Sequence, residues 1–573
     1  MREGLMMDDH PLSLAAIVQR AETFSPDRAV AFRRPDGTVG KTTLGKCAAR
    51  AHLLAGALRE LGVGPGDVVG TLLWNQPEHL ELYLALPAMG AVIHTLNPRL
   101  SAEELGFIIA DAGDRVLVVD GTLLPVLEAI EPACRPDRVV VVRHDAGAAA
   151  ASGDPGAAAA SPEPGATGRG QQLGPGHLDY EQLLSGAQPL AWSMVPERAA
   201  AAMCYTSGTT GRPKGVLYSH RALVLHSICA ALPDATDVSA RDTVLPVVPM
   251  FHVNAWGMIY TAALVGAGLV LPGPRLDAVS ILELLSGERV TITAGVPTVW
   301  MAVLQALDAE PDRWDLRALR ALMVGGSAVP ESLLAGFDRH GLRIVQAWGM
   351  TETSPLASVC RLPAELEDAP ASERYAYRAR QGRPLPLVEI RARGEDGRLI
   401  EWDDVAMGEL EVRGPWVARA YHSGAGADRF TDDGWFRTGD VVRIDRSGNL
   451  RICDRAKDLV KSGGEWISSV DMENLLMAHD AVAEAAVIAV PDERWGERPL
   501  AVVALHPGMA ADADELRAHL SRGFARWQLP DRFEFVEAIP RTATGKFKKT
   551  ALREMFASGG ASAPSPARSA AAR

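Results

Sequence analysis

Short runs of valine, isoleucine and leucine alternate along this chain with longer amphipathic stretches. Residues 116–119 and 139–142 are apolar and β-branched, which is typical of buried strands, whereas residues 44–61 have the spacing of an amphipathic helix. This alternation predicts an α/β chain with largely parallel sheets, because parallel strands are joined by helical crossovers. Further strands are expected at 68–73, 199–204, 245–248, 290–294 and 321–324.

The 573 residues exceed what one hydrophobic core usually holds, so more than one domain is expected. Residues 382–413 have a strand-rich, hairpin-like pattern. Beyond a charged segment at 454–458, the pattern is helix, strand, strand, helix, strand, which is typical of a small α/β domain. We therefore predict a large N-terminal domain at 1–456 and a small, mobile C-terminal lid at 457–556.

Three segments stand apart in composition. Residues 145–178 and the tail at 557–573 consist mostly of Ala, Gly, Pro and Ser, which cannot bury a core, so both are predicted to be disordered. The run at 253–274 is uncharged and long enough to cross a bilayer, but glycine, proline and asparagine interrupt it. A buried helix, a turn and a short strand at 269–271 are the favoured interpretation.

Charge and cysteine content narrow the function classes. The formal net charge of −13 argues against a nucleic-acid partner, and it means that an anionic substrate needs local positive charge. The six cysteines include no C-x-x-C pair, which argues against a zinc site or a disulfide framework and favours a reduced, cytoplasmic setting. No apolar signal segment follows Met1, and no basic amphipathic membrane anchor is evident.

The stretch from Tyr205 to Gly215, Y-T-S-G-T-T-G-R-P-K-G, combines glycines, hydroxyl side chains and two positive charges. Glycines let the backbone approach a ligand, and successive N–H groups with Ser and Thr hydroxyls form an anion site. We therefore predict a phosphate-binding loop. It has neither the Walker spacing nor the dinucleotide G-x-G-x-x-G pattern. By composition alone, a flexible surface loop is the alternative.

A second string, Q-A-W-G-M-T-E-T-S-P at 346–355, suits a nucleotide site. Trp348 can stack on adenine, Thr351 can bind phosphate, and Glu352 can hold Mg²⁺, which prefers oxygen ligands. Asp440, at the end of W-F-R-T-G-D, can accept hydrogen bonds from both ribose hydroxyls. An ordinary turn aspartate is the alternative there.

Two further candidate residues, His252 and Lys546, each have a simpler interpretation than a functional role when taken alone. His252 lies in the apolar string P-M-F-H-V-N-A-W, where a core histidine is the simpler interpretation. Lys546 ends P-R-T-A-T-G-K, and it is followed by Lys548 and Lys549, so a solvated charge is the simpler interpretation. The small residues of V-G-G-S-A-V-P at 324–330 permit close approach of a flat ring or a narrow apolar chain.

In this order, these strings resemble the adenylate-forming superfamily of acyl-CoA synthetases, adenylation domains and luciferases. The resemblance covers residues 13–556 apart from the insertion. It implies a large N-terminal domain of parallel-sheet α/β layers with a distorted β-barrel, and a lid that turns between two reactions. It also implies ATP and Mg²⁺ as cofactors and CoA as a co-substrate.

The resemblance further implies individual roles. Lys546, Glu352, Thr206 and His252 are expected to be catalytic, with Thr206 and Glu352 on the metal. The nucleotide is expected to contact Thr206, Ser207, Gly208, Thr209, Thr210, Gly211, Lys214, Ser327, Ala328, Gln346, Trp348, Gly349, Thr351, Asp440 and Arg455. The hinge and thioester loop are expected at Lys457, Lys461, Gly463, Gly464 and Trp466, and the acyl pocket at Trp256, Val253 and Gly325.

The activity implied is ATP-dependent ligation of a carboxylic acid to CoA through an acyl-adenylate, with release of AMP and pyrophosphate. Residues 296–300 and 463–471 look most like bacterial medium- and long-chain fatty-acyl-CoA synthetases, so a fatty acid is expected. The alternatives are a short or substituted acid such as methylthio-propionate, an acceptor other than CoA, and a non-enzymatic nucleotide-binding protein. An apolar substrate suggests loose association with membranes, and analogy with dimeric relatives suggests a homodimer.

Overall fold

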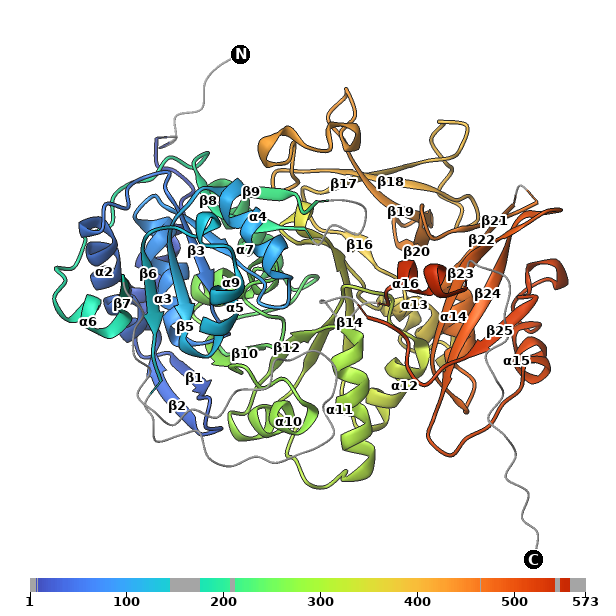
Figure 1. The fold of residues 1–573 in the computed structure, drawn as a ribbon. Helices are drawn as coiled ribbons and strands as arrows, with labels where there is room; N and C mark the ends of the chain where they lie inside the picture. Colours follow the sequence, from blue (N-terminus) through green and yellow to red (C-terminus); the bar gives the residue numbers. More distant parts are fainter. Residues whose placement is uncertain are drawn as a thin grey trace, which may run out of the picture. The chain divides into compact units, whose positions relative to one another are not determined.

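The computed structural model describes residues 7, 9–144, 176–206, 212–463, 465–541 and 547–556. Their contacts divide the chain into two compact units. The first takes the described residues up to Thr438 with Val442–Ile452, and the second takes Gly439–Val441 with the described residues from Cys453 onward. The predicted fold class is confirmed: mixed α/β with large parallel sheets and a smaller C-terminal unit (Figure 1). The domain boundary predicted after residue 456 marks the start of the expected mobile lid, and it stays a prediction.

One large sheet of the first unit is parallel except at its last pair of strands, β8 and β9, which are antiparallel. Its strand order is β7 (His177–Asp179), β6 (Val139–Val142), β5 (Asp114–Asp120), β3 (Val68–Leu72), β4 (Val92–Thr95), β8 (Ala200–Tyr205) and β9 (Gly215–Ser219). The residues of β6 are all buried, as expected for an uninterrupted valine run in a parallel sheet.

The other large sheet is parallel from β14 to β1 and antiparallel at both edges. Its order is β16 (Arg383–Pro384), β15 (Leu356–Val359), β14 (Ile344–Gly349), β13 (Ala321–Val324), β12 (Ile292–Gly295), β10 (Thr243–Pro246), β11 (Gly268–Leu271), β1 (Ala29–Arg33) and β2 (Val39–Thr43). The carboxyl ends of neighbouring parallel strands meet at one edge, where ligands of open α/β sheets usually bind.

Helices fill the space between the two sheets and cover their outer faces. A shared core joins both sheets to α1 (Leu14–Phe24), α2 (Leu44–Glu60), α3 (Pro77–Ala88), α7 (His220–Ala230) and α9 (Met258–Val265). A second cluster packs β12 to β14 against α10 (Ala278–Gly287), α11 (Pro297–Ala309) and α12 (Glu331–Arg339), which lie near these strands in Figure 1. A third packs β3 and β5 against α4 (Ala102–Ala112) and α5 (Leu124–Ala129).

Local signals explain where several of these helices begin. At α4, the Ser101 hydroxyl accepts a hydrogen bond from the Glu104 amide at 3.2 Å, and the Glu104 carboxylate accepts from the Ser101 amide at 3.0 Å. This reciprocal capping satisfies donors that would otherwise be left unpaired. Gly113 ends the helix in the left-handed conformation that glycine adopts readily.

The remaining elements form two smaller sheets with short helices. One sheet runs β17 (Glu389–Arg393), β18 (Gly408–Arg413), β19 (Phe436–Ile444) and β20 (Leu450–Arg455), and its first two strands lie in the region predicted to be strand-rich. In the second unit, β22 (Glu465–Ile467), β21 (Val460–Ser462), β24 (Gly496–Leu505), β23 (Val482–Asp492) and β25 (Arg532–Phe535) pack on α14 (Ser469–Met477) and α15 (Ala513–Leu520). The first unit also holds α6 (Tyr180–Ser185) and α13 (Ala371–Arg378).

Several sequence expectations need correction in detail. Strand β7 begins at His177, so the low-complexity segment predicted at 145–178 ends too late; pairing with β6 orders His177 and Leu178 despite the composition before them. Residues 145–175 and 557–573 lie outside the described residues. Within 253–274, α9 and β11 are confirmed, whereas residues 253–256 (α8, Val253–Trp256) have left-handed backbone angles. In the described part of the chain, no helix is long and apolar enough to cross a membrane.

Candidate active site

The ends of the predicted phosphate loop are fixed by the antiparallel pair β8 and β9. The Thr206 amide donates to the Lys214 carbonyl at 2.9 Å, and the Lys214 amide donates to the Thr206 hydroxyl at 3.3 Å. Gly215 is closely surrounded, since a Cβ there would lie 2.8 Å from Met203 Cε, 3.0 Å from Tyr205 Cζ and 3.1 Å from His422 Cβ. The predicted ligands Ser207, Gly208, Thr209, Thr210 and Gly211 lie outside the described residues.

Glu352 and Lys214 are brought together by a residue that sequence reasoning missed. Glu352 is 6% exposed and lies in a 3₁₀ turn (η3, Thr351–Thr353) after β14. The Tyr421 hydroxyl donates to Glu352 Oε1 at 2.5 Å, and Lys214 Nζ lies 5.1 Å from the centroid of the Tyr421 ring. Burial and the neighbouring Glu352 carboxylate raise the pKa of Tyr421, so its hydroxyl remains a donor.

The fit of this cluster to a metal and a phosphate follows from its donor atoms. Glu352 Oε2 makes no hydrogen bond with any residue that the structure describes, while Oε1 is held by Tyr421. A carboxylate oxygen that has no partner among the described residues suits Mg²⁺, and a nearby ammonium suits a phosphate oxygen. Thr206 would add a hydroxyl oxygen on the neighbouring loop.

The β14 segment places the expected adenine ligands at the carboxyl edge of its sheet. Trp348 and Gln346 are buried within β14, and Ser327 and Ala328 follow the adjacent parallel strand β13. Gln346 Oε1 is buried and has no hydrogen-bond partner among the described residues. Buried polar atoms are nearly always satisfied in native proteins, so this orphan acceptor supports a ligand donor at this edge.

Gly349 and Thr351 are each held by a close contact of the backbone. A Cβ on Gly349 would lie 1.8 Å from the carbonyl oxygen of Pro355, which a rigid backbone cannot accommodate. The Tyr218 hydroxyl donates to the Thr351 carbonyl at 2.8 Å from strand β9. Tyr218 thus ties the Thr-Glu turn to the same hairpin that carries the phosphate loop.

The predicted acyl-pocket residues Trp256 and Gly325 are neighbours in the structure. A Cβ on Gly325 would lie 3.4 Å from Trp256 Cη2 and 2.6 Å from the Ala347 carbonyl. Glycine is therefore required by the close approach of β14, while the indole lies at ordinary contact distance. Val253 is buried, and His252 is half-buried immediately before it.

The backbone of Val253–Trp256 is left-handed, with φ values between 46° and 55° at four residues other than glycine. Left-handed geometry costs such residues about 1–2 kcal/mol each, so surrounding contacts must hold it. Asn75 accepts from the Met250 amide at 2.6 Å and donates to the Val248 carbonyl at 3.0 Å. Tyr83 donates to the Met250 carbonyl at 2.6 Å. Sequence reasoning missed both Asn75 and Tyr83.

We expect Trp256→Ala to shift the preferred acyl-chain length. Removing the indole frees space beside Gly325, so longer or wider chains should gain kcat/KM relative to shorter ones by about tenfold, the scale of methylene discrimination in apolar pockets. The KM for ATP should change less than about twofold. Steady-state kinetics over an acid series would measure this, with the half-exposed Trp402→Ala as the control. A change confined to ATP binding would contradict the acyl-pocket assignment.

In the second unit, the two predicted nucleotide ligands pair with each other. Arg455 Nε lies 2.8 Å from Asp440 Oδ1; the aspartate is buried and the arginine is partly exposed.

Burial lowers the pKa of Lys457, the expected hinge residue, which lies in a turn. Lys461 Nζ lies 5.7 Å from the centroid of the Trp466 ring. Gly463 has a φ of 62°, which suits glycine, while Gly464 and the catalytic candidate Lys546 lie outside the described residues.

Lys549, which follows the exposed Lys548, forms an ion pair in a largely buried setting. Its Nζ lies 2.6 Å from Glu473 Oε1, and the two side chains are 12% and 9% exposed. On the same helix, α16 (Lys549–Phe556), Arg553 pairs with Asp458 at 2.7 Å, beside the expected hinge. Two ion pairs therefore fasten α16 to α14 and to the segment that contains Lys457.

We expect Lys549→Met to destabilise the second unit strongly. Removing one partner leaves the Glu473 carboxylate buried and unpaired, which typically costs about 3–5 kcal/mol. The exposed neighbour variant Lys548→Met should have almost no effect, because surface charges contribute little. The double variant Lys549→Met/Glu473→Gln should recover part of the loss. Thermal and urea unfolding would test this, and equal stability of the two single variants would refute the buried pair.

Comparisons with known proteins agree with this geometry. The family model described as AMP-binding enzyme matches residues 18–422, and the model described as AMP-binding enzyme C-terminal domain matches residues 471–546. The chain is 48% identical over 554 residues to a long-chain-fatty-acid–CoA ligase of Thermus thermophilus, covering 96% of each chain. It is 41% identical to a medium-chain-fatty-acid–CoA ligase of Ectopseudomonas oleovorans, covering 96% of this chain and 97% of the relative.

Among solved structures, the chain is similar to the anthranilate CoA ligase AuaEII in complex with anthranoyl-AMP. The TM-score is 0.81 at 25% identity, and the match covers 96% of this chain and 99% of that one. The similarity thus spans both units and includes a structure that holds an acyl-adenylate.

Proposed function

The chain belongs to the AMP-binding enzyme family, and from this membership we propose that it is an AMP-forming acyl-CoA synthetase for medium- to long-chain fatty acids. It joins a carboxylate to the α-phosphate of ATP, releases pyrophosphate, and transfers the acyl group to the thiol of CoA. The contact of Tyr421 with both Glu352 and Lys214 carries the proposal, because these are the two residues proposed to bind the metal and the phosphate. The 48% identity to a long-chain ligase supports a fatty substrate.

The first reaction is proposed to occur at the carboxyl edge formed by β13 and β14. Lys214 and the loop after Thr206 bind the phosphates, and Trp348 stacks on adenine. Glu352 and Thr206 would hold Mg²⁺, which when bound neutralises charge on the phosphate oxygens. The acyl chain lies past Trp256 toward Gly325, with His252 beside the carboxylate.

The second reaction is proposed to use the other face of the C-terminal unit. Lys546 supports adenylation and then withdraws as the unit turns about Lys457. The segment of Gly463, Gly464 and Trp466 then enters, and the thiolate of CoA attacks the carbonyl carbon of the adenylate while AMP leaves. Hinge steps of this kind often limit turnover.

ATP–pyrophosphate exchange tests the proposal when it is run with acids from acetate to palmitate and repeated as CoA thioester formation. Both activities should peak at the same medium or long chain length. A peak at a short or methylthio-substituted acid would show that the substrate belongs to that class instead. Exchange without thioester would indicate another acceptor, and absence of exchange with every acid would favour a non-enzymatic nucleotide-binding protein.

We also propose a homodimer that works in the cytoplasm in loose contact with membranes, from which its apolar substrate is drawn. Light scattering coupled to size-exclusion chromatography would test the dimer, and a monomer at micromolar concentration would exclude it. Co-sedimentation with phospholipid vesicles would test the membrane contact. Complete recovery in the supernatant with and without fatty acid would exclude that contact.

A further inference from the structure

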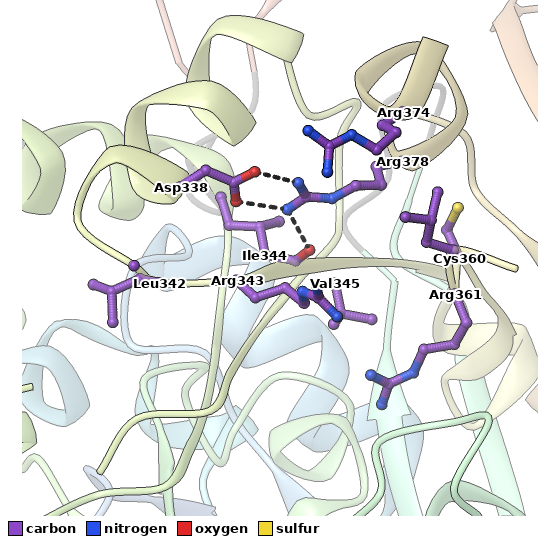
Figure 2. Close-up of a pocket in the computed structure, with 11 residues that line it drawn as sticks. Asp338, Leu342, Arg343, Ile344, Val345, Cys360, Arg361, Arg374 and Arg378 are labelled. Atoms are coloured by element: carbon purple, nitrogen blue, oxygen red, sulfur yellow. Dashed lines mark hydrogen bonds and ion pairs between the residues drawn. The ribbon is translucent and has the colours of Figure 1, made fainter. Parts of the chain in front are cut away.

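The first unit contains a pocket of about 320 Å³ at the start of β14, away from the candidate active site. Its walls come from the end of α12, the turn into β14, the residues after β15, and α13 (Figure 2). Ile344 lies at this end of β14 and Gly349 at the other. Five residues of strand separate them by roughly 16 Å, so the pocket is distinct from the nucleotide edge.

Positive charge dominates the lining. The pocket is lined by four arginines, Arg343, Arg361, Arg374 and Arg378, and by one carboxylate, Asp338. Figure 2 shows Asp338 facing Arg378, whose two terminal nitrogens donate to the two carboxylate oxygens, one of them at 3.0 Å. The only acidic side chain of the lining is thus already paired.

Among the residues that the structure describes, no carboxylate contacts the other three arginines. Arg361 donates to the neutral Ala235 carbonyl at 2.6 and 3.1 Å. The Arg343 guanidinium makes no hydrogen bond or ion pair with the described residues. Arg374 Nε is buried and has no hydrogen-bond partner in the described part of the chain. Three arginines of the lining, of which Arg361 and Arg374 are partly buried and Arg343 is exposed, therefore have no contacting counter-charge in the described part of the chain.

Such an arrangement is electrostatically unfavourable by itself. Burial lowers the pKa of Arg361; the nearby Asp237 and Asp234 act against this shift, while Arg320 and Arg343 act with it. Asp237 is engaged by Arg320 at 2.6 Å. A bound anion would offset the repulsion and satisfy the buried donor. Guanidinium groups match phosphate oxygens through paired N–H donors, and Arg374 and Arg378 present theirs from one face of α13.

We propose that this pocket binds a small phosphate-bearing anion at a site separate from the active site. Its volume lies at the lower end of the range for ligand pockets, which favours phosphate, pyrophosphate or the phosphate end of a nucleotide over a large organic molecule. The anion would sit between Arg343, Arg361 and Arg374, with Arg378 held in place by Asp338.

Isothermal titration calorimetry with pyrophosphate tests the site, with an acyl-sulfamoyl adenosine, which carries no phosphate group, present at saturation to block the nucleotide edge. One equivalent should bind to the unmodified chain. The Arg343→Gln/Arg374→Gln variant should bind at least about tenfold more weakly, because each charged hydrogen bond contributes on this scale. The control Arg398→Gln, whose side chain is 88% exposed, should bind normally. Arg374→Lys should bind more weakly than the unmodified chain but more tightly than the Arg343→Gln/Arg374→Gln variant, because it keeps the charge and loses the paired N–H donors.

Parallel titrations with inorganic phosphate and with adenosine 3′,5′-bisphosphate identify the source of the phosphate. Tighter binding of the bisphosphate would assign the pocket to a nucleotide-derived group, and tighter binding of phosphate or pyrophosphate would assign it to the free anion. Absence of binding by all three anions would overturn the proposal. Equal binding to the unmodified chain and to a folded Arg343→Gln/Arg374→Gln variant would also overturn it. The test does not depend on ligase activity.

Discussion

Lys546→Ala is expected to reduce ATP–pyrophosphate exchange by about 100-fold or more while leaving thioester formation from supplied acyl-adenylate within a few-fold of normal. A positive charge that bridges the carboxylate and the α-phosphate acts only on adenylation, and removal of one such group typically costs about 10²–10³ in rate. Because the bond between the carboxylate and the α-phosphate already exists in the acyl-adenylate, the attack by the CoA thiol does not need this lysine. The two half-reactions are measured separately with radiolabelled pyrophosphate and with synthetic acyl-AMP plus CoA.

The flanking residues make this variant interpretable. Arg541 and Phe547 pair as an isolated bridge, Arg541 pairs with Glu484, and Phe547 packs against an apolar cluster of the second unit. The substitution at 546 removes none of these contacts. Lys548→Ala, an exposed charge two residues away, is the matched control and should leave both half-reactions unchanged. Equal loss in both half-reactions, or equal effects of the two variants, would refute the assignment.

The parts of the site that the sequence predicted are those in which a local string carries the chemistry. Thr351 and Glu352 lie in a turn directly after a buried strand, and neither position depends on distant residues for its recognition. Trp256 and Gly325 belong to two separate strings, and the structure brings them within contact. The alternating valine-rich runs predicted the parallel sheets for the same reason, since burial and β-branching act within a few residues.

The parts that were missed depend on contacts between distant segments. Tyr421 is one tyrosine in a loop, and nothing near it in the sequence indicates that it meets Glu352, 69 residues away. Nothing in the sequence around Lys549 indicates that it pairs with Glu473 on another helix. No glycine lies within the left-handed residues Val253–Trp256 to signal them, and Tyr83, which donates to the Asn254 side chain at 3.2 Å, is 171 residues away in the chain.

Glu352→Gln is expected to raise the Mg²⁺ concentration needed for half-maximal exchange by about 10–100-fold and to lower the maximal rate by about 10²-fold. The amide keeps the shape of the side chain but loses the charge that a hard cation requires, and lost ligand contacts in metal sites have effects of this size. Exchange measured against free Mg²⁺ at fixed ATP would show the shift. Thioester formation from acyl-AMP should change much less, because no phosphate is being displaced from ATP.

Tyr421→Phe separates the positioning of Glu352 by Tyr421 from the binding of the metal by Glu352. The phenyl ring keeps its place beneath Lys214, whereas the hydroxyl that orients Glu352 Oε1 is lost. The Mg²⁺ requirement should therefore rise, but less than in Glu352→Gln, while ATP KM stays nearly constant. A Glu352→Gln enzyme with a lower rate and an unchanged Mg²⁺ requirement would show that the carboxylate acts on the reaction without binding the metal. In that case Tyr421→Phe would leave the Mg²⁺ requirement unchanged as well, because its hydroxyl affects the metal only through Glu352.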